Sequence, residues 1–359
     1  MTLGWGIVST GRHPDNKIVP AMKLAEGNRA IGIYSRDKDR GEAFAQKHGL
    51  PAAYDSLEDL LQNPEIQAVF IASPNSLHAL HTKMAAEAGK HVLVEKPMAV
   101  NVSEALDMVH TCRKSGVKLG VGFHLRHHPG HRRARQFIQD GTVGFISLAQ
   151  AQFFSPDKRG VVNLPRRTGL SQWWEDPAMT GGAYSIMGMG VHALDLLQFL
   201  LGQSITEVAA ITDGQSVQKP LEQIAAIALR FGNGAVGTVC CGRRVPDTKN
   251  DAVVYGTGGR VWLQDTLWES LRGKLEVVSD AVNTEESYEG DLLSLYKLQI
   301  EAFSRALERD EDFDASGMDG LRAVQVASAI IESASTGRAV KIEPLSLPSR
   351  ISTYSERLK

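Results

Sequence analysis

The chain has 359 residues, and its 39 Lys and Arg against 41 Asp and Glu give a formal net charge of −2. A near-neutral balance gives no support for a nucleic-acid-binding or membrane-surface protein, and no apolar run approaches the ~18 residues of a membrane span. Hydrophobic residues at 43% and charged residues at 22% are typical of a globular protein and exclude a largely disordered one. The length predicts about two domains.

The first third of the chain alternates short apolar runs with amphipathic stretches. Strands are expected at residues 3–9, 30–35, 68–73, 91–95 and 118–123. Helices are expected at residues 17–25, around 41–45, and at 77–88 and 102–114. Strands that are apolar throughout are typical of a parallel sheet that helices cover on both faces. The order predicts a doubly wound α/β domain with a mostly parallel sheet over residues 1–123.

After residue 123 the pattern changes to closely spaced strands joined by short turns. Strand-like runs lie at residues 144–154, 208–211, 224–231, 235–241, 251–255 and 260–263. Helices are expected at residues 190–201, 291–307 and 317–335, whereas residues 155–177 have no regular pattern. This pattern predicts an α+β domain over residues 124–359, built on an open, mainly antiparallel sheet.

The chain contains three cysteines, Cys112, Cys240 and Cys241. Adjacent cysteines pair poorly and no CxxC motif is present, so we expect neither a disulfide framework nor a cysteine-based zinc site. The N-terminus enters a strand-like run at once and lacks the charged start of a secretory signal. We therefore expect a reducing, cytoplasmic compartment.

The first expected strand runs into Ser9-Thr10-Gly11-Arg12-His13. A glycine-bearing turn between a strand and a helix lets backbone amides approach a pyrophosphate, and the helix N-terminus favours the negative charge. The strict GxGxxG pattern fails, because Ser9 stands where a glycine is usual and Pro14 ends the pattern. The motif alone is compatible with a dinucleotide site or an ordinary turn, and the surrounding βαβ pattern favours the site.

The second expected strand ends in Tyr34-Ser35-Arg36-Asp37-Lys38-Asp39-Arg40. An NAD site usually places an acid at this strand end, where it accepts hydrogen bonds from the ribose. Here the strand ends in Ser35-Arg36, and an arginine fork suits a 2′-phosphate. We expect NADP or NAD as the cofactor, with NADP slightly favoured and its 2′-phosphate near Ser35, Arg36 and Arg40. A solvated run of charges is the alternative.

The fourth expected strand ends in Val94-Glu95-Lys96-Pro97. Ligands of an open parallel sheet bind outside the carboxyl ends of its strands, which makes Lys96 a candidate acid or base. Its ammonium could polarise a carbonyl or, if burial lowers its pKa, take a hydroxyl proton. A surface charge is the alternative.

His192 and Asp195 fall on one face of an expected helix, three residues apart. A neutral histidine can shuttle a proton near pH 7, and a core histidine held by Asp195 is equally compatible with the spacing. Residues 123–136 hold four His and four Arg. No carboxylate completes a ligand shell within that run, so we expect a solvated basic helix start and no metal.

Together these motifs resemble the Gfo/Idh/MocA family, the glucose-fructose oxidoreductase and inositol dehydrogenase group, over nearly the whole chain. The segment Ser9 to Arg12 resembles the family's nucleotide loop, and Ser73-Pro74-Asn75 with His78 resembles its strand-end signature near the nicotinamide. Glu95-Lys96-Pro97 is similar to its central EKP motif, and the run from Gly181 to His192 is similar to its glycine-rich stretch before the catalytic histidine.

The resemblance implies a Rossmann domain and an α+β domain whose open sheet forms an oligomer interface, so a homo-oligomer, dimer or tetramer, is expected. It implies Lys96 and His192 as catalytic residues and a cis bond before Pro97. The implied cofactor contacts are Ser9, Thr10, Gly11, Arg12, His13, Ser35, Arg36, Arg40, Ser73, Pro74, Asn75, His78, Glu95, Lys96, Arg126 and Trp173. The expected substrate contacts are Lys96, His124, Arg166, Arg167, Tyr184 and His192.

Three departures from the family pattern stand out. The family usually carries an Asp four residues before the histidine, where this chain has Gly188, and often Trp-Arg where it has Trp173-Trp174. The third departure is Ser9. Loss of the acid at position 188 leaves more of the proton transfer to Lys96, with Tyr184 as a substitute donor. It also suits either an anionic substrate bound by arginines such as Arg126, Arg166 and Arg167 or a bulkier neutral sugar.

The function predicted first is an NAD(P)-dependent oxidoreductase that moves a hydride between the cofactor and a small sugar, polyol or sugar derivative. The alternative is an NAD-dependent glycoside hydrolase that works by transient oxidation, since the family contains such enzymes. A third hypothesis is a dinucleotide sensor that has lost its chemistry. No nucleic-acid or membrane partner is expected.

Overall fold

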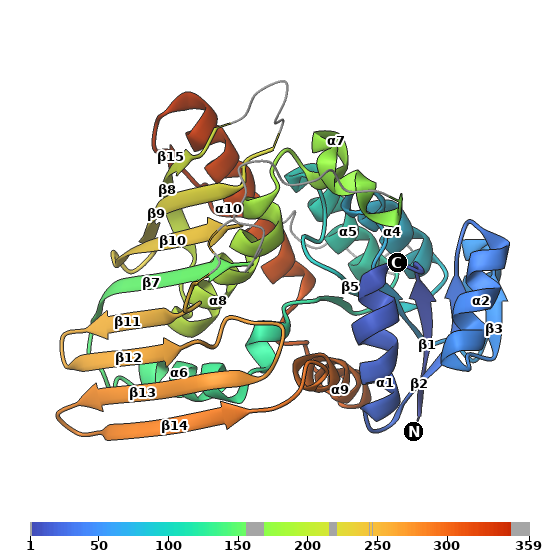
Figure 1. Ribbon diagram of the computed structural model, residues 1–359, viewed down its shortest axis with the longest axis horizontal. Coiled ribbons are helices and arrows are strands. Elements are labelled where there is room, and N and C mark those ends of the chain that lie inside the picture. Colours follow the sequence, from blue (N-terminus) through green and yellow to red (C-terminus); the bar gives the residue numbers. More distant parts are fainter. Residues whose placement is uncertain (1, 156–168, 215–220, 244, 246, 346–359) are drawn as a thin grey trace, which may run out of the picture.

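The structure is a computed structural model that describes residues 2–155, 169–214, 221–243, 245 and 247–345. Two sheets organise it (Figure 1): one of six strands in the order β3-β2-β1-β4-β5-β6, and one of nine in the order β14-β13-β12-β11-β7-β10-β9-β8-β15. The C-terminal helices lie between the two sheets and against the first sheet. Packing contacts therefore join the two halves of the chain in addition to the connecting segment.

The first sheet is parallel throughout, as expected. Its strands are β1 (Leu3–Val8), β2 (Asn28–Tyr34), β3 (Ala52–Tyr54), β4 (Ala68–Ile71), β5 (His91–Val94) and β6 (Leu119–Val121). The helical segments between them are η1 (Pro14–Ile18), α1 (Val19–Leu24), α2 (Lys38–His48), α3 (Leu57–Gln62), η2 (Asn75–Leu77), α4 (His78–Glu87) and α5 (Val102–Lys114). The strand order reverses between β1 and β4, which is where doubly wound sheets bind ligands.

The second sheet is antiparallel except where β10 lies parallel to β7. Its strands are β7 (Ile146–Phe154), β8 (Ile205–Thr212), β9 (Ile224–Phe231), β10 (Val236–Gly242), β11 (Ala252–Gly256), β12 (Gly259–Gln264), β13 (Arg272–Ser279), β14 (Asn283–Glu289) and β15 (Val340–Lys341). Its helical segments are η3 (His124–His127), α6 (Pro129–Gln139), η4 (Gly169–Glu175), α7 (Pro177–Thr180), η5 (Ile186–Gly190), α8 (Val191–Leu201), α9 (Ser294–Glu308) and α10 (Gly317–Thr336). The expected fold class is confirmed.

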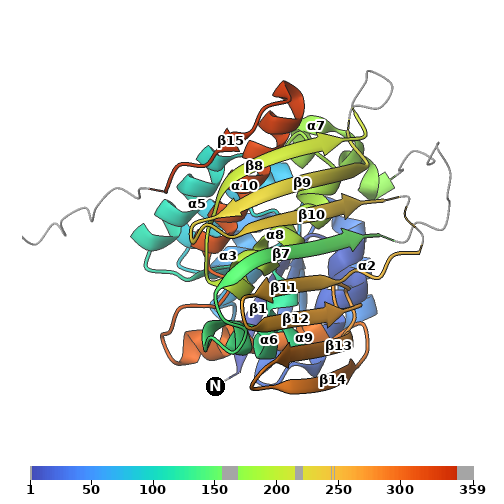
Figure 2. The same ribbon diagram turned by 90° about the vertical axis from the view of Figure 1, so that its left-hand side faces the viewer.

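No helix of the described residues covers one face of the nine-stranded sheet, as Figure 2 shows for β8 to β14. Exposed apolar side chains along these strands include Ile211 on β8 and Tyr255 on β11. Association of copies through this face stays a prediction, as does the cytoplasmic compartment. Within the described ranges, no helix is both long and apolar enough to cross a membrane.

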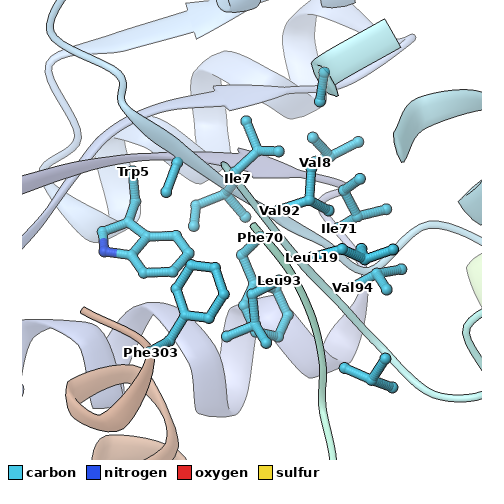
Figure 3. Close-up of a cluster of buried hydrophobic side chains, with 14 of the residues drawn as sticks. Trp5, Ile7, Val8, Phe70, Ile71, Val92, Leu93, Val94, Leu119 and Phe303 are labelled. Atoms are coloured by element: carbon cyan, nitrogen blue, oxygen red, sulfur yellow. The ribbon is translucent and has the colours of Figure 1, made fainter. Parts of the chain in front are cut away.

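The core of the first sheet is completed by residues from the C-terminal third of the chain. Phe303 of α9 is fully buried and lies with its ring centroid 5.5 Å from that of Trp5 on β1 (Figure 3). A side chain at Gly120 of β6 would clash with Phe303 and Phe313, so this glycine permits their close approach. The division at residue 123 stays a prediction, and residues 1–123 alone would leave this core open.

We predict that Phe303→Ala destabilises the whole chain by about 3–5 kcal/mol, because it removes a large buried ring and leaves a cavity. Urea unfolding measured by circular dichroism checks this prediction. Phe145→Ala is the matched control, since Phe145 is 62% exposed and its loss creates no cavity. A cost below about 1 kcal/mol for Phe303→Ala would contradict the role of α9 in the first core.

Candidate active site

The carboxyl ends of the first-sheet strands carry the expected nucleotide loop. Ser9 follows β1 with φ of 122°, in the region that favours glycine, which explains why a glycine is usual there. The Gly11 N–H donates to Ser9 Oγ at 3.1 Å, and a Cβ on Gly11 would lie 3.3 Å from that oxygen. Arg12 and His13 open the following helix, where the first amides have no intrahelical acceptor. Backbone donors and a space that Gly11 leaves free therefore suit a bound phosphate group.

Two of the residues expected at a 2′-phosphate, Ser35 and Arg40, meet directly, and Thr10 joins them. Arg40 donates from Nε to Thr10 Oγ1 at 2.9 Å and from Nη2 to Ser35 Oγ at 3.3 Å. Its Nη1 pairs with Asp37 at 3.1 Å, so the nearest carboxylate is already balanced. Arg36 is exposed beside this group. Hydroxyls and guanidinium groups at this strand end can bind the ribose and its phosphate.

Two buried histidines, His78 and His81, hold the segment after β4 in place. His78 places Nε2 2.8 Å from the Ser73 carbonyl oxygen and Nδ1 2.8 Å from that of Pro97. Ser73 Oγ lies 3.0 Å from Nδ1 of His81, and Asn75 donates to the Thr180 carbonyl at 3.4 Å. His78 thereby joins the strand-end signature, with Pro74 in it, to the segment that follows Lys96. The Lys96–Pro97 bond is cis, which confirms that expectation.

Lys96 reaches from the end of β5 to the second half of the chain. Its Nζ donates a hydrogen bond to the carbonyl oxygen of Gly188 at 3.1 Å. The ammonium is therefore bound by a backbone carbonyl at the position where the family pattern has a carboxylate nearby. Burial lowers the pKa of Lys96, and Lys17 lowers it further, whereas Glu95 and Glu269 act in the opposite direction. An amine with a lowered pKa can exchange a proton closer to neutral pH.

Glu95 is buried and bonded to the nucleotide loop. Its Oε1 lies 2.8 Å from Nε2 of His13. Burial acts to raise the pKa of Glu95, but His13, Lys96 and His124 outweigh it and hold the pKa at about 2. Glu95 therefore stays ionised and keeps a fixed negative charge beside Lys96.

His192 lies at the start of α8, directly after the π-helical turn η5. Its ring centroid is 4.7 Å from that of His124, and burial lowers its pKa well below 6.5, so the ring is neutral at pH 7. Nδ1 is buried and has no hydrogen-bond partner in the described structure. The carboxylate of Glu222 accepts from the amides of Tyr184 and Ile186 at 2.9 Å each, which fixes the start of η5 and, through it, the position of His192.

Asp195 does not hold His192, because it pairs with Arg126. Arg126 donates from Nε and Nη2 to the two Asp195 oxygens at 2.8 and 2.5 Å, and it also bonds to the Asp314 carbonyl. The core-histidine alternative, in which Asp195 holds the ring, is therefore wrong. The Arg126 fork is saturated by these partners, so we do not assign it to cofactor or to an anionic substrate.

The Gly188 position is open on its side-chain face. Among the described residues, a Cβ there would meet only Trp174 Cζ3, at 3.9 Å. Trp173 stacks on Trp174 at 4.3 Å, and Trp174 lies edge-on to Tyr184 at 5.5 Å. Arg166 and Arg167 lie outside the described residues. Trp173 and Tyr184 therefore belong to the aromatic group around Gly188.

The histidines of residues 123–136 are not solvated, which corrects that expectation. His127, His128 and His131 are all buried. His128 Nδ1 accepts from the Gly130 amide at 3.0 Å at the start of α6, and His131 lies 2.7 Å from the Leu125 carbonyl and 2.9 Å from Thr266 Oγ1. The His128 and His131 rings serve as internal hydrogen-bonding groups of the folded chain. No metal-ligating cluster occurs in the part of the chain that the structure describes.

Three residues that the sequence reasoning missed complete the site. Lys17 of η1 forms an ion pair with Glu269, which lies between β12 and β13, and the Lys17 ammonium lies 5.6 Å from the ring centroid of Tyr296 on α9. No local motif marks these residues. They meet because the π-helical turn η1, the β12–β13 connection of the second sheet and α9 converge on the end of β5.

We predict that Gly188→Asp folds normally and raises the pKa of Lys96, because the new side chain has space and its carboxylate favours the ammonium. The pH at which Lys96 deprotonates, measured by NMR titration, should rise. Gly190→Asp is the steric control, since a Cβ at Gly190 would lie 3.1 Å from Cys241 Sγ. An unfolded Gly188→Asp protein, or one with an unchanged or lower Lys96 pKa, would contradict this geometry.

Comparison with known proteins agrees with this geometry. The 1,5-anhydro-D-fructose reductase of Ensifer adhaerens is 29% identical over 341 residues, which cover 94% of this chain and 98% of that enzyme. The D-xylose 1-dehydrogenase (NADP(+)) 2 of Haloferax volcanii is 29% identical over 342 residues, which cover 94% and 99%. The structure of levoglucosan dehydrogenase with NADH and levoglucosan has the same fold, with a TM-score of 0.83 at 21% identity over 96% of this chain and 100% of that one.

Family models cover both halves. The model described as "Oxidoreductase family, NAD-binding Rossmann fold" matches residues 3–123, and the "GFO/IDH/MocA C-terminal domain" matches residues 131–262. The chain belongs to the GFO/IDH/MocA family of oxidoreductases.

Proposed function

We propose that this protein is an NAD(P)-dependent oxidoreductase that acts on a CH–OH group, or the corresponding carbonyl, of a sugar-like molecule. The observation that carries the proposal is the position of Lys96. It is a lysine of lowered pKa at the carboxyl end of a parallel strand, bonded to Gly188 and close to His192. Two relatives at 29% identity are named for activity on an anhydro sugar and on xylose, which supports the substrate class.

The cofactor assignment rests on the loop after β1 and the cluster after β2. Ser9, Gly11 and the helix start offer donors and space to a pyrophosphate, and Arg40 joins Thr10 to Ser35. At the end of β2, Ser35-Arg36 stand where an NAD site usually places an acid, and the nearby carboxylate of Asp37 pairs with Arg40, which favours NADP over NAD. When bound, the nicotinamide supplies the hydride donor or acceptor.

In the proposed mechanism, Lys96 carries the proton of the reacting hydroxyl. For oxidation, neutral Nζ takes the hydroxyl proton, and for reduction the ammonium returns it to the developing alkoxide. The neutral His192 ring, which lies near enough to Lys96 to feel its charge, is the second group proposed to hydrogen-bond the same oxygen. Glu95 stays ionised and stabilises the protonated form of Lys96 in either direction.

The glycoside-hydrolase alternative makes a different prediction about the cofactor. Absorbance at the nicotinamide band should change in proportion to substrate if the protein is a net oxidoreductase. A hydrolase would release sugar with no net change in that band. Tight cofactor binding with no turnover across neutral sugars and sugar acids would instead favour the sensor hypothesis.

We predict that Lys96→Met lowers turnover by a factor on the order of 10²–10⁴, because the proton carrier is lost. Steady-state rates together with cofactor titration check this, and cofactor affinity should change little. Lys118→Met is the control, since Lys118 pairs with Asp310 at 3.0 Å, away from the site. Turnover retained by Lys96→Met would remove this residue from the mechanism.

We predict that Arg40→Ala and Arg36→Ala weaken NADPH binding by roughly 1–3 kcal/mol and NADH binding much less, because each removes a charge-assisted donor for the 2′-phosphate. Fluorescence titration of both cofactors measures the two losses. Arg29→Ala is the control, because Arg29 pairs with Glu65 at 3.5 Å near the amino end of β2. Equal losses for both cofactors would defeat the NADP assignment.

A further inference from the structure

Tyr296 is a buried tyrosine that the proposed mechanism does not use. It lies on α9 and is 2% exposed. Its ring centroid lies 5.3 Å from that of His13 and 5.1 Å from that of His124, and the Lys17 ammonium approaches it at 5.6 Å. The ring is therefore enclosed by three polar side chains, two of them from the segment that opens the nucleotide loop and its helix.

The Tyr296 hydroxyl makes no hydrogen bond to any residue that the structure describes. A buried tyrosine normally finds a partner for its O–H, and one left without a partner costs about 1–3 kcal/mol. The hydroxyl is not among the side-chain atoms that are sealed inside without a partner, in contrast to Nδ1 of His192. It is therefore a donor available to a bound molecule.

Two carboxylates lie near this hydroxyl. Burial raises the pKa of Tyr296 well above 10, and Glu269 and Glu95 raise it further, so the O–H stays protonated. Glu269 is bound on one side by Lys17, and its side chain is 53% exposed. The neighbouring Trp268 carbonyl accepts from His124 Nε2 at 3.3 Å, which holds the Glu269 segment against the site.

The described charged groups around Tyr296 are of both signs. Lys17 and Lys96 are cations, and Glu95 and Glu269 are anions. His124 and His192 are neutral, because burial lowers the pKa of His124 to about 4 and that of His192 well below 6.5. Arg126, which could have added a positive charge, is neutralised by Asp195. Among the described residues, the two lysines near Tyr296 are accompanied by two carboxylates, and this environment offers both a hydroxyl donor and a carboxylate acceptor.

We infer that Tyr296 and Glu269 form the recognition wall for a neutral, polyhydroxylated substrate. The Tyr296 O–H donates to a substrate hydroxyl oxygen beside the reacting carbon, and the Glu269 carboxylate accepts from a substrate O–H. This inference rests on the proposed function and names its substrate class. The glycine at position 188 suits either an anionic substrate or a bulkier neutral sugar, and this inference favours the neutral sugar.

Tyr296→Phe tests the inference, because it removes one oxygen and keeps the ring that packs on His13, His124 and Lys17. We expect kcat/KM for neutral sugars to fall on the order of 10- to 100-fold, the effect of an unpaired substrate hydroxyl, while the cofactor dissociation constant stays unchanged. A deoxy analogue that lacks the recognised hydroxyl should lose this difference between wild type and variant. Tyr288→Phe is the matched control, since the Tyr288 hydroxyl bonds to Glu286 at 2.6 Å on β14.

Glu269→Gln tests the inference through the pH dependence of oxidation, which would not change if the role of Glu269 were purely structural. Loss of its charge removes an influence that raises the pKa of Lys96. The pH at which oxidation begins should therefore shift to lower values, together with a rise in KM. Glu285→Gln is the control, because Glu285 pairs with Lys274 at 2.8 Å and is 52% exposed.

The substrate panel consists of D-glucose, D-xylose and 1,5-anhydro-D-fructose, with D-glucuronate and D-xylonate as acid counterparts. If wild type turns over panel members and Lys96→Met does not, but Tyr296→Phe stays within twofold of wild type, the inference fails and the proposed function stands. A preference for the acids over the neutral sugars also overturns the inference. If wild type turns over none and Lys96→Met behaves identically, the proposed function fails as well.

Discussion

The hydrogen bond from Lys96 Nζ to the Gly188 carbonyl joins the two halves of the molecule at the point where the chemistry is proposed. It spans from the end of β5 in the first sheet to the π-helical turn η5 before α8. A carbonyl is a weaker partner for an ammonium than a carboxylate, so burial determines the direction of the pKa shift. The ionised Glu95 and the more distant Glu269 then keep the protonated form accessible. Proton transfer by Lys96 depends on this balance between burial and nearby charge.

This bond depends in turn on how the C-terminal helices are used. α9 supplies Phe303 to the core of the first sheet, and about two turns earlier it supplies Tyr296 to the site. The same helix therefore stabilises the nucleotide-binding half and furnishes a substrate-facing hydroxyl. α10 packs against α5 of the first half and against β8 and α8 of the second. Because α8 carries His192, the packing that holds the two halves together also sets the distance between the proposed proton-handling groups.

Residues at strand ends could be predicted from the sequence because parallel topology brings every carboxyl end to one edge. Ser9, Ser35, Ser73 and Lys96 follow β1, β2, β4 and β5, and they lie at that edge in the structure. β14 could not be predicted, since its Asn283–Glu289 segment alternates no apolar residues and is exposed or half-buried throughout. The sequence also could not show that Arg126, which the family resemblance implies as a cofactor contact, forms an ion pair with Asp195 in the folded chain.

Tyr296, Glu269 and Lys17 could not be found by sequence reasoning for a different reason. They lie in an amphipathic helix, a loop between two strands and the turn after the nucleotide loop, and none belongs to a local motif. Their proximity is a property of the three-dimensional fold, in which α9 and the β12–β13 connection meet the first helix. The aromatic group of Trp174 and Tyr184 beside Gly188 is similar, because only the fold places these rings next to the missing acid.

The most direct test of the proposed proton transfer is a measurement of the pKa of Lys96. Lysine labelled with ¹³C at Cε reports deprotonation through its chemical shift, and the spectrum of Lys96→Arg identifies the Lys96 resonance. We expect a Lys96 midpoint below the ordinary lysine value of 10.5, because burial disfavours the ammonium. A midpoint for Lys96 at or above the ordinary value would contradict a buried, carbonyl-bound amine and the proton transfer assigned to it.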